Sequence, residues 1–222
     1  MDLIKAVGDR RSIRSFRSEP VPKRVLEEIL EICRWAPSSR NTQPWEVAVL
    51  GGKVMEEFKA RITEKVVARA EPNPDTPAAE LSGLYLKRAI ENRDRIDCYQ
   101  FPPGTESLEE KRAEYWMSGG RFFDAPNGII LYIDKTLYPA ALLDIGIMIQ
   151  AICLVAFAHG LATCPIRRVV YWPDILRNLL AIPQSKKIVL GIAIGYRNPE
   201  ARVNDYIRKR EPLESWVHWH GF

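Results

Sequence analysis

The sequence predicts an α+β fold in which helices surround a mixed β-sheet. Three observations support this class: helical patterns cover nearly half of the 222 residues, strand-like patterns are few, and residues 139–159 form a nearly all-apolar helix. A helix that is apolar all round is buried on several sides. In a chain of this length a subunit interface is the simplest second surface, so the sequence also predicts a homodimer.

The predicted elements follow from hydrophobic periodicity and from the residues that start and stop helices. In chain order, the predicted helices span residues 2–8, 22–35, 53–70, 80–96, 108–123, 139–159 and 172–180. The predicted strands span residues 45–50, 127–134 and 187–196, and residues 160–165 form a short link or a strand.

The helix at 22–35 illustrates how these boundaries arise. Its apolar residues recur at the spacing of one helix face: Val25, Leu26, Ile29, Leu30 and Cys33. Pro22 suits the first turn, and Pro37 ends the helix and opens a polar loop. The strand at 45–50 then carries β-branched valines at alternate positions, and Gly51-Gly52 turns it.

Two stretches lack a regular pattern. Residues 71–78 contain three prolines, and residues 98–107 contain Pro102, Pro103 and Gly104. We interpret 71–107 as an excursion from a single domain spanning 1–222, and loops of this length often act as lids. The tail from 198 to 222 carries Trp216, Trp219 and Phe222 without periodicity, so we expect this C-terminal arm to pack on the partner subunit.

Composition excludes several classes of protein. The net charge is only +4, and no basic stripe interleaved with aromatic residues is visible, which argues against nucleic-acid binding. The four cysteines lack the spacing of metal ligands. No signal peptide and no apolar run of membrane-spanning length is found, so we expect a cytoplasmic protein without a membrane partner.

Two basic clusters stand near the ends of the chain. Residues 10–14 read Arg-Arg-Ser-Ile-Arg, and Arg208-Lys209-Arg210 supplies the second cluster. Guanidinium groups bind phosphate through planar bidentate hydrogen bonds. A phosphorylated cofactor held by both ends is therefore one interpretation, and solvated surface charge is the other.

A polar loop follows the helix at 22–35. Residues 37–43 read Pro-Ser-Ser-Arg-Asn-Thr-Gln, and a side-chain amide presents a donor and an acceptor side by side. Such groups suit the hydrogen-bonding edge of a polar heterocycle. A loop of small polar residues after a helix is the simpler interpretation.

These motifs carry a resemblance. RRSIRSF, a helix and then APSSRNTQPWEV are similar to the opening of the FMN-dependent nitroreductase family. The similarity continues through Phe123-Asp124-Ala125-Pro126, the segment 160–166, the segment 191–196 and the tail motif Arg210-Glu211-Pro212-Leu213, in the family's order. The resemblance implies an intertwined homodimer with two FMN sites at the interface.

The resemblance also implies which residues bind FMN. The phosphate and ribityl chain would be held by Arg10, Arg11, Ser12, Arg14, Arg208 and Arg210. The flavin ring would be contacted by Pro37, Ser38, Ser39, Asn41 and Gln43, some of them from the opposite subunit. The segment over the ring would be Pro165, Ile166, Arg167 and Arg168, with backbone N–H groups directed at flavin N5 and O4.

The activity implied is a ping-pong oxidoreduction. NADH or NADPH would give hydride to flavin N5, and a nitroaromatic, quinone or activated alkene would then be reduced, with no catalytic side chain required. Two alternatives stay open: an FMN enzyme of this fold with different chemistry, such as a reductive dehalogenase or an oxygen-dependent flavin-cleaving enzyme, and a non-catalytic flavin-binding protein.

Three residues are candidates for contact with the small-molecule acceptor. Tyr99 and Phe101 could stack on a flat acceptor, and Arg168 could pair with an acidic substituent. Many family members carry a glycine near position 168, so Arg168 is a departure. The simpler interpretation is that both aromatic residues pack the loop that carries them.

Overall fold

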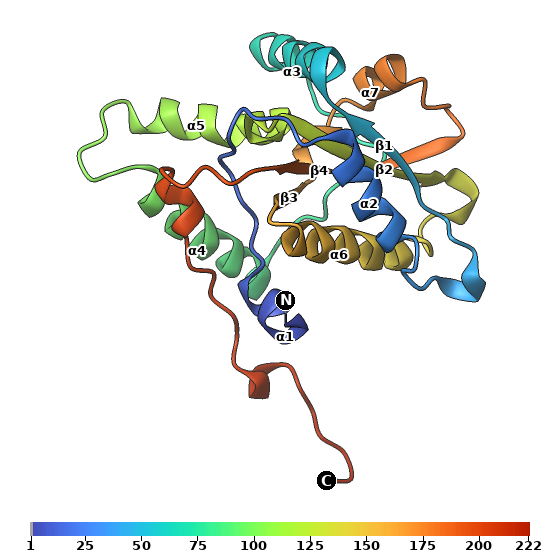
Figure 1. Ribbon diagram of the computed structural model, residues 1–222. Coiled ribbons are helices and arrows are strands. Elements are labelled where there is room, and N and C mark those ends of the chain that lie inside the picture. The colour runs from blue at the N-terminus through green and yellow to red at the C-terminus, as the bar shows by residue number, and fades with distance from the viewer. Residues whose placement is uncertain (1) are drawn as a thin grey trace.

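The computed structural model describes residues 2–222 as three layers, with a sheet between two groups of helices (Figure 1). One face of the sheet is covered by α3 (Gly52–Val67) and α7 (Pro173–Leu180), and the other by α2 (Lys23–Cys33) and α6 (Leu142–Ala158). The remaining α-helices are α1 (Leu3–Asp9), α4 (Gly83–Gln100) and α5 (Leu108–Ser118). The predicted α+β class is confirmed.

The sheet has four strands in the order β1-β2-β4-β3. They are β1 (Glu46–Leu50), β2 (Asn127–Asp134), β3 (Ala162–Ile166) and β4 (Lys186–Gly195). All three pairings between these strands are antiparallel, whereas a mixed sheet was expected. The parallel component is the isolated bridge between Ser12 and Thr163. Periodicity locates strands but carries no information on their direction, which explains the difference.

Strand β2 separates the two hydrophobic cores. Ile129, Leu131 and Ile133 face α2 and α6, and Ile130 faces α3 and α7; all four side chains are fully buried. Successive side chains of a strand point to opposite faces, so a strand covered on both sides must be apolar throughout. This explains why residues 127–134 appear as an apolar run rather than an alternating pattern.

Gly191 in β4 allows the layers to approach closely. A Cβ atom there would lie 2.6 Å from Cγ1 of Val169 and 3.0 Å from the Phe122 ring. The backbone of Gly191 is extended, so the lack of a side chain serves packing rather than a turn. A larger residue at position 191 would therefore push the layers apart.

Two predicted boundaries are wrong. Helix α4 continues through Gln100, although residues 98–107 were expected to be irregular. The first residue that stops it is Pro102, because the residue before a proline avoids helical geometry, and Phe101 is extended. The helix expected at 108–123 ends at Ser118, where a Gly-Gly pair begins a 3₁₀ segment, Gly119–Asp124.

Residues 71–77 form a strap along the free part of β4. Strand β3 pairs only with residues 191–195, which leaves the first half of β4 without a strand on that side. Asp75 accepts the Ile188 N–H at 2.8 Å and pairs with Arg177 of α7 at 2.7 Å. The first part of the predicted excursion is therefore anchored, and α4 is the part that projects.

Helix α6 buries most of its surface but not all of it. Leu143 is 79% exposed and Ile147 is 41% exposed on the side turned away from the sheet. Exposed leucine and isoleucine on one stripe of a helix leave an apolar face without a partner in the single chain. Although α6 is strongly apolar, no helix within residues 2–222 combines the length and hydropathy needed to span a membrane.

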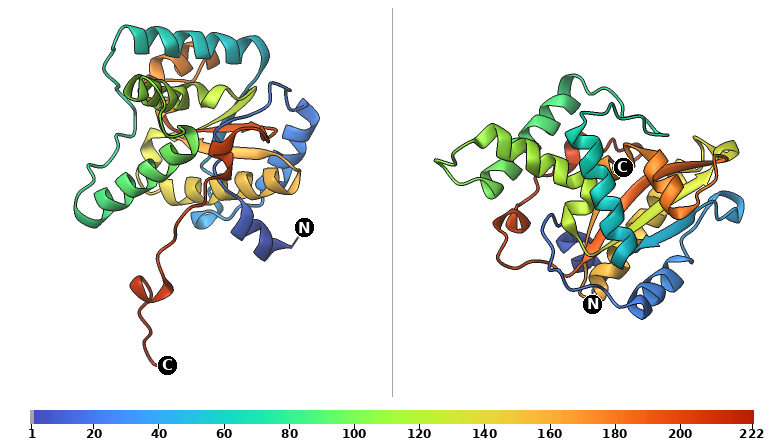
Figure 2. Two further views of the ribbon diagram at one scale, coloured as in Figure 1. Left: turned by 90° about the vertical axis from the view of Figure 1, so that its left-hand side faces the viewer. Right: turned by 90° about the horizontal axis from the view of Figure 1, so that it is seen from above.

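The C-terminal arm leaves the body of the molecule from Ile207 onward, whereas Asn204 and Tyr206 before it are buried. It extends beyond α1 in two views at right angles (Figures 1 and 2). Trp216 is 63% exposed, Trp219 66% and Phe222 fully exposed. These aromatic side chains therefore have no cover within residues 2–222, and their packing on another subunit stays a prediction.

Candidate functional site

The segment after α1 runs along the edge of β3. The Ile13 N–H donates to the Thr163 carbonyl oxygen at 3.0 Å, and Ser12 bridges Thr163 in parallel. Alternate residues of an extended segment share one side. Arg10, Ser12 and Arg14 accordingly approach the same buried group, the Cys164 thiol.

Cys164 is not set up as a nucleophile. Burial raises the pKa of its thiol to about 11, although Arg14, a hydrogen bond with Ser12 and Arg10 oppose the shift. A thiol with this pKa is protonated at neutral pH and is a weak nucleophile. The cysteine therefore acts as a small buried side chain beneath the basic segment.

The two basic clusters meet in space. Arg208 donates a hydrogen bond to the carbonyl oxygen of Gly8. The pKa of Arg208 is lowered by burial and by the positive charges of Arg210, Arg10 and Arg11. Four guanidinium groups from the two ends of the chain thus crowd one region, and a bound anion would relieve their repulsion.

An unpaired hydrogen-bond donor in this region also indicates a site for an anion. The Nε atom of Arg10 is buried and has no hydrogen-bond partner within residues 2–222. A buried donor without an acceptor is costly unless a ligand completes it. A phosphate group satisfies both requirements, since it carries negative charge and several acceptor oxygens.

A buried asparagine that was not predicted from the sequence holds the two ends of the chain together. The Asn204 side chain accepts the Arg14 N–H at 2.9 Å and donates to the Ser15 carbonyl at 2.9 Å. Asn204 is 1% exposed. Nothing in an irregular tail distinguishes a buried asparagine from an exposed one, so no sequence signal could have found it.

Helix α4 contributes a third basic cluster, which was not predicted from the sequence either. Arg88, Asn92 and Arg95 line a cavity of about 220 Å³ together with Lys209 and Arg210. Arg88 lies 3.5 Å from Glu211 of the arm, and its Nε has no hydrogen-bond partner among the described residues. Residues 88, 92 and 95 have the i, i+4, i+7 spacing of one helix face. This spacing could have predicted that the three side chains lie together.

The polar loop is a pre-formed turn. Its Ser39 N–H donates to Asp144, a buried residue in the first turn of α6, at 3.1 Å. Within the loop, the Gln43 N–H donates to Ser38 Oγ at 2.9 Å. Asn41 and Gln43 have positive φ angles and are exposed. The backbone of the loop is therefore fixed by hydrogen bonds, while the amide side chains of Asn41 and Gln43 stay exposed.

The loop and the basic cluster lie at opposite ends of α6. Ser39 is bound near its start, whereas Phe157 and Gly160 at its end line a cavity of about 400 Å³ with Arg10 and Arg11. A helix of 17 residues is about 25 Å long. One chain therefore brings together Arg10, Arg11, Ser12, Arg14, Arg208 and Arg210, but it does not bring them to the loop.

Residues 165–168 comprise the end of β3 and the two arginines that follow it. Pro165 and Ile166 pair with Ile192 and Gly191 of β4. The Arg167 side chain donates to the Thr76 carbonyl oxygen of the strap.

Arg168 faces α5. It donates to the Trp116 carbonyl oxygen and stacks on the Trp116 ring at 5.1 Å from the centroid. These two contacts hold the guanidinium against α5. Contact between Arg168 and an acidic acceptor stays a prediction.

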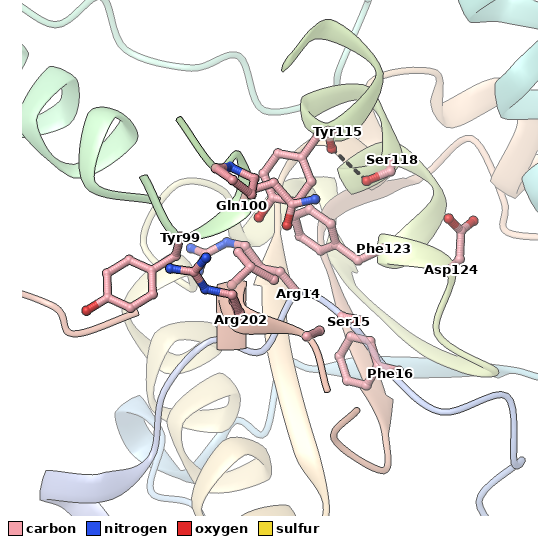
Figure 3. Close-up of a pocket in the computed structure, with 13 residues that line it drawn as sticks. Arg14, Ser15, Phe16, Tyr99, Gln100, Tyr115, Ser118, Phe123, Asp124 and Arg202 are labelled. Carbon is pink, nitrogen blue, oxygen red and sulfur yellow. Dashed lines mark hydrogen bonds between the residues drawn. The ribbon is translucent and has the colours of Figure 1, made fainter. Parts of the chain in front are cut away.

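The two aromatic candidates behave differently. Phe101 packs edge-on against Tyr115, with ring centroids 5.9 Å apart, and this supports the structural interpretation of Phe101. Tyr99 packs edge-on against Tyr206 at 6.1 Å, but it also lines a cavity of about 440 Å³ that contains Arg14 (Figure 3). Phe101 lines a neighbouring cavity of about 460 Å³, so both aromatic residues remain candidates for ligand contact.

Comparison with known proteins identifies what this arrangement resembles. Residues 7–196 match the model of the nitroreductase family. The chain is 30% identical to a 4-nitrobenzoate reductase of Pseudomonas putida, over 100% of this chain and 96% of the relative. It is 31% identical to a nitrobenzene nitroreductase of Ectopseudomonas oleovorans, over 98% of this chain and 96% of that protein.

A solved structure shows the same fold. The FMN-dependent nitroreductase NfnB of Mycobacterium smegmatis, crystallised with NADPH, superimposes with a TM-score of 0.88. The match is 26% identical and covers 99% of this chain and 100% of the other. The architecture and the chain length therefore agree from end to end.

Proposed function

The chain belongs to the nitroreductase family, and on that premise we propose that it is an FMN-dependent oxidoreductase that uses NAD(P)H to reduce nitroaromatic acceptors. The resemblance inferred from the sequence motifs is confirmed by this membership. Two kinds of relative support this activity: proteins named for the reduction of nitrobenzoate and nitrobenzene, and a structural neighbour crystallised with NADPH. The structural observation that carries the proposal is the crowding of Arg10, Arg11, Arg208 and Arg210.

The residues of this chain would divide the binding of FMN between them. Arg10, Arg208 and Arg210 would hold the phosphate, and Ser12 and Arg14 would hold the ribityl chain beside the edge of β3. FMN, when bound, supplies the two-electron hydride chemistry that no side chain of this protein can perform. The protein's task is then to bind, orient and exclude water, which agrees with a site without a catalytic acid or base.

We further propose that the active form is a homodimer. The distance between the basic cluster and the loop 37–43 supports this, because a partner chain can supply the loop that the same chain cannot. The exposed face of α6 and the aromatic arm at 198–222 supply apolar surface for such an interface. We also propose a cytoplasmic location and a single domain, with α4 as the projecting part over the site.

Leu143→Lys is expected to dissociate this dimer and to release FMN, because it places a charge in the apolar interface that α6 would form. Light scattering and the flavin absorbance of the purified protein measure both effects. Val67→Lys is the matched control, since Val67 on α3 is 78% exposed and Leu143 is 79% exposed. A Leu143→Lys protein that stays dimeric and retains FMN would exclude α6 from the interface.

The proposed activity is tested by the visible spectrum of the purified protein and by anaerobic titration with NADH and with NADPH. We expect a bound flavin that is bleached by at least one nicotinamide and reoxidised by nitrobenzene. A flavin that neither nicotinamide reduces would favour the alternative FMN chemistries. A flavin that is reduced but transfers electrons to no acceptor would favour a binding protein.

A further inference from the structure

A cavity of about 440 Å³ lies between the C-terminal end of α4, helix α5, the segment 14–16 and the 3₁₀ segment Arg202–Asp205 (Figure 3). Its walls carry four aromatic rings, contributed by Phe16, Tyr99, Tyr115 and Phe123. A cavity with walls of this kind fits a flat aromatic ligand.

Two guanidinium groups face this cavity. Arg14 and Arg202 both line it, and neither forms an ion pair within residues 2–222. The carboxylate at its rim, Asp124, is already paired with Arg121 at 3.2 Å. The cavity therefore holds an excess of positive charge that an anionic ligand would balance.

A buried hydroxyl group without a partner adds a donor to the same cavity. Tyr115 is 8% exposed, and its hydroxyl is buried without a hydrogen bond in the described chain. Burial raises the pKa of Tyr115, and the Arg14 charge only partly opposes this. The phenol is thus neutral at pH 7 and can donate a hydrogen bond. Gln100 presents an amide to the same space.

We propose that this cavity binds the carboxylate of an aromatic acid acceptor, with Arg202 and the Tyr115 hydroxyl as the groups that recognise it. The inference rests on the proposed reductase function and names the acceptor class of that site. Arg14 connects the two regions, since it lies beside Ser12 and Cys164 and also lines the cavity. An arginine and a neutral phenol together match a carboxylate, which has two acceptor oxygens and one negative charge.

The direct test is calorimetric titration of the FMN-loaded protein with benzoate, which has the ring and the carboxylate but no group to be reduced. We expect Arg202→Gln to weaken benzoate binding about tenfold and Tyr115→Phe to weaken it several-fold. Arg24→Gln on α2 removes the same charge away from the cavity and is expected to change the affinity less than about twofold. Benzyl alcohol, the neutral analogue, should not distinguish Arg202→Gln from the unmodified protein.

A kinetic comparison separates this inference from the function on which it rests. We expect Arg202→Gln to lower kcat/KM for 4-nitrobenzoate about tenfold relative to nitrobenzene. If nitrobenzene is reduced but benzoate binds equally to the variant and the unmodified protein, or to neither, the carboxylate site is overturned and the reductase stands. If neither nitro compound is reduced, the reductase fails, and the benzoate titration still decides the site.

Discussion

Replacing Asp75 with alanine is expected to lower the free energy of unfolding by about 3–5 kcal/mol, the cost of breaking a buried ion pair from one side. The Arg177 side chain is 7% exposed and lies 2.7 Å from the carboxylate. The substitution leaves this guanidinium without its counter-charge and the Ile188 N–H without its acceptor. Urea unfolding followed by circular dichroism measures the loss.

Glu28→Ala provides the matched control. Its pair with Arg24 has side chains 47% and 88% exposed, so we expect a change of less than about 1 kcal/mol. Asp75→Asn should fall between the two, because an amide oxygen can still accept the Ile188 N–H but carries no charge. If Asp75→Ala costs no more than Glu28→Ala, residues 71–77 do not anchor the edge of β4.

Arg10→Ala and Arg208→Ala are each expected to weaken FMN binding by about 1.5–3 kcal/mol, the usual contribution of a hydrogen bond to a charged group. This corresponds to roughly tenfold to more than a hundredfold in the dissociation constant. The reason is that Arg10 has an unpaired buried Nε and that Arg208 lies among three other guanidinium groups. Fluorescence titration of the apoprotein with FMN measures the change.

Much of the fold could be predicted because its elements have local causes. The helix at 22–35 follows from one apolar face, and β2 was predicted with its observed bounds, Asn127–Asp134. The helix boundary at residue 100 was wrong because a proline two residues later, rather than polar composition, ends α4. Strand direction could not be predicted, because it depends on how distant segments cross.

The site was predictable only where residue type itself implies a ligand. Guanidinium groups at both ends suggested a shared anion, and Arg208 does contact Gly8. The roles of Arg168 and Asn204 could not be predicted, because each is set by a neighbour far away in the sequence: Trp116 for Arg168, and Ser15 for Asn204. The same limit applies to the strap, whose Asp75 and Arg177 are separated by 102 residues.

The most direct measurement compares FMN with riboflavin, which differs by the phosphate alone, in binding to the apoprotein and its Arg10→Ala and Arg208→Ala variants. We predict that the unmodified protein prefers FMN strongly and that each substitution reduces this preference at least about tenfold while riboflavin affinity stays constant. Equal weakening of both flavins, or an unchanged preference for FMN, would contradict the claim that the two ends of the chain together bind the phosphate.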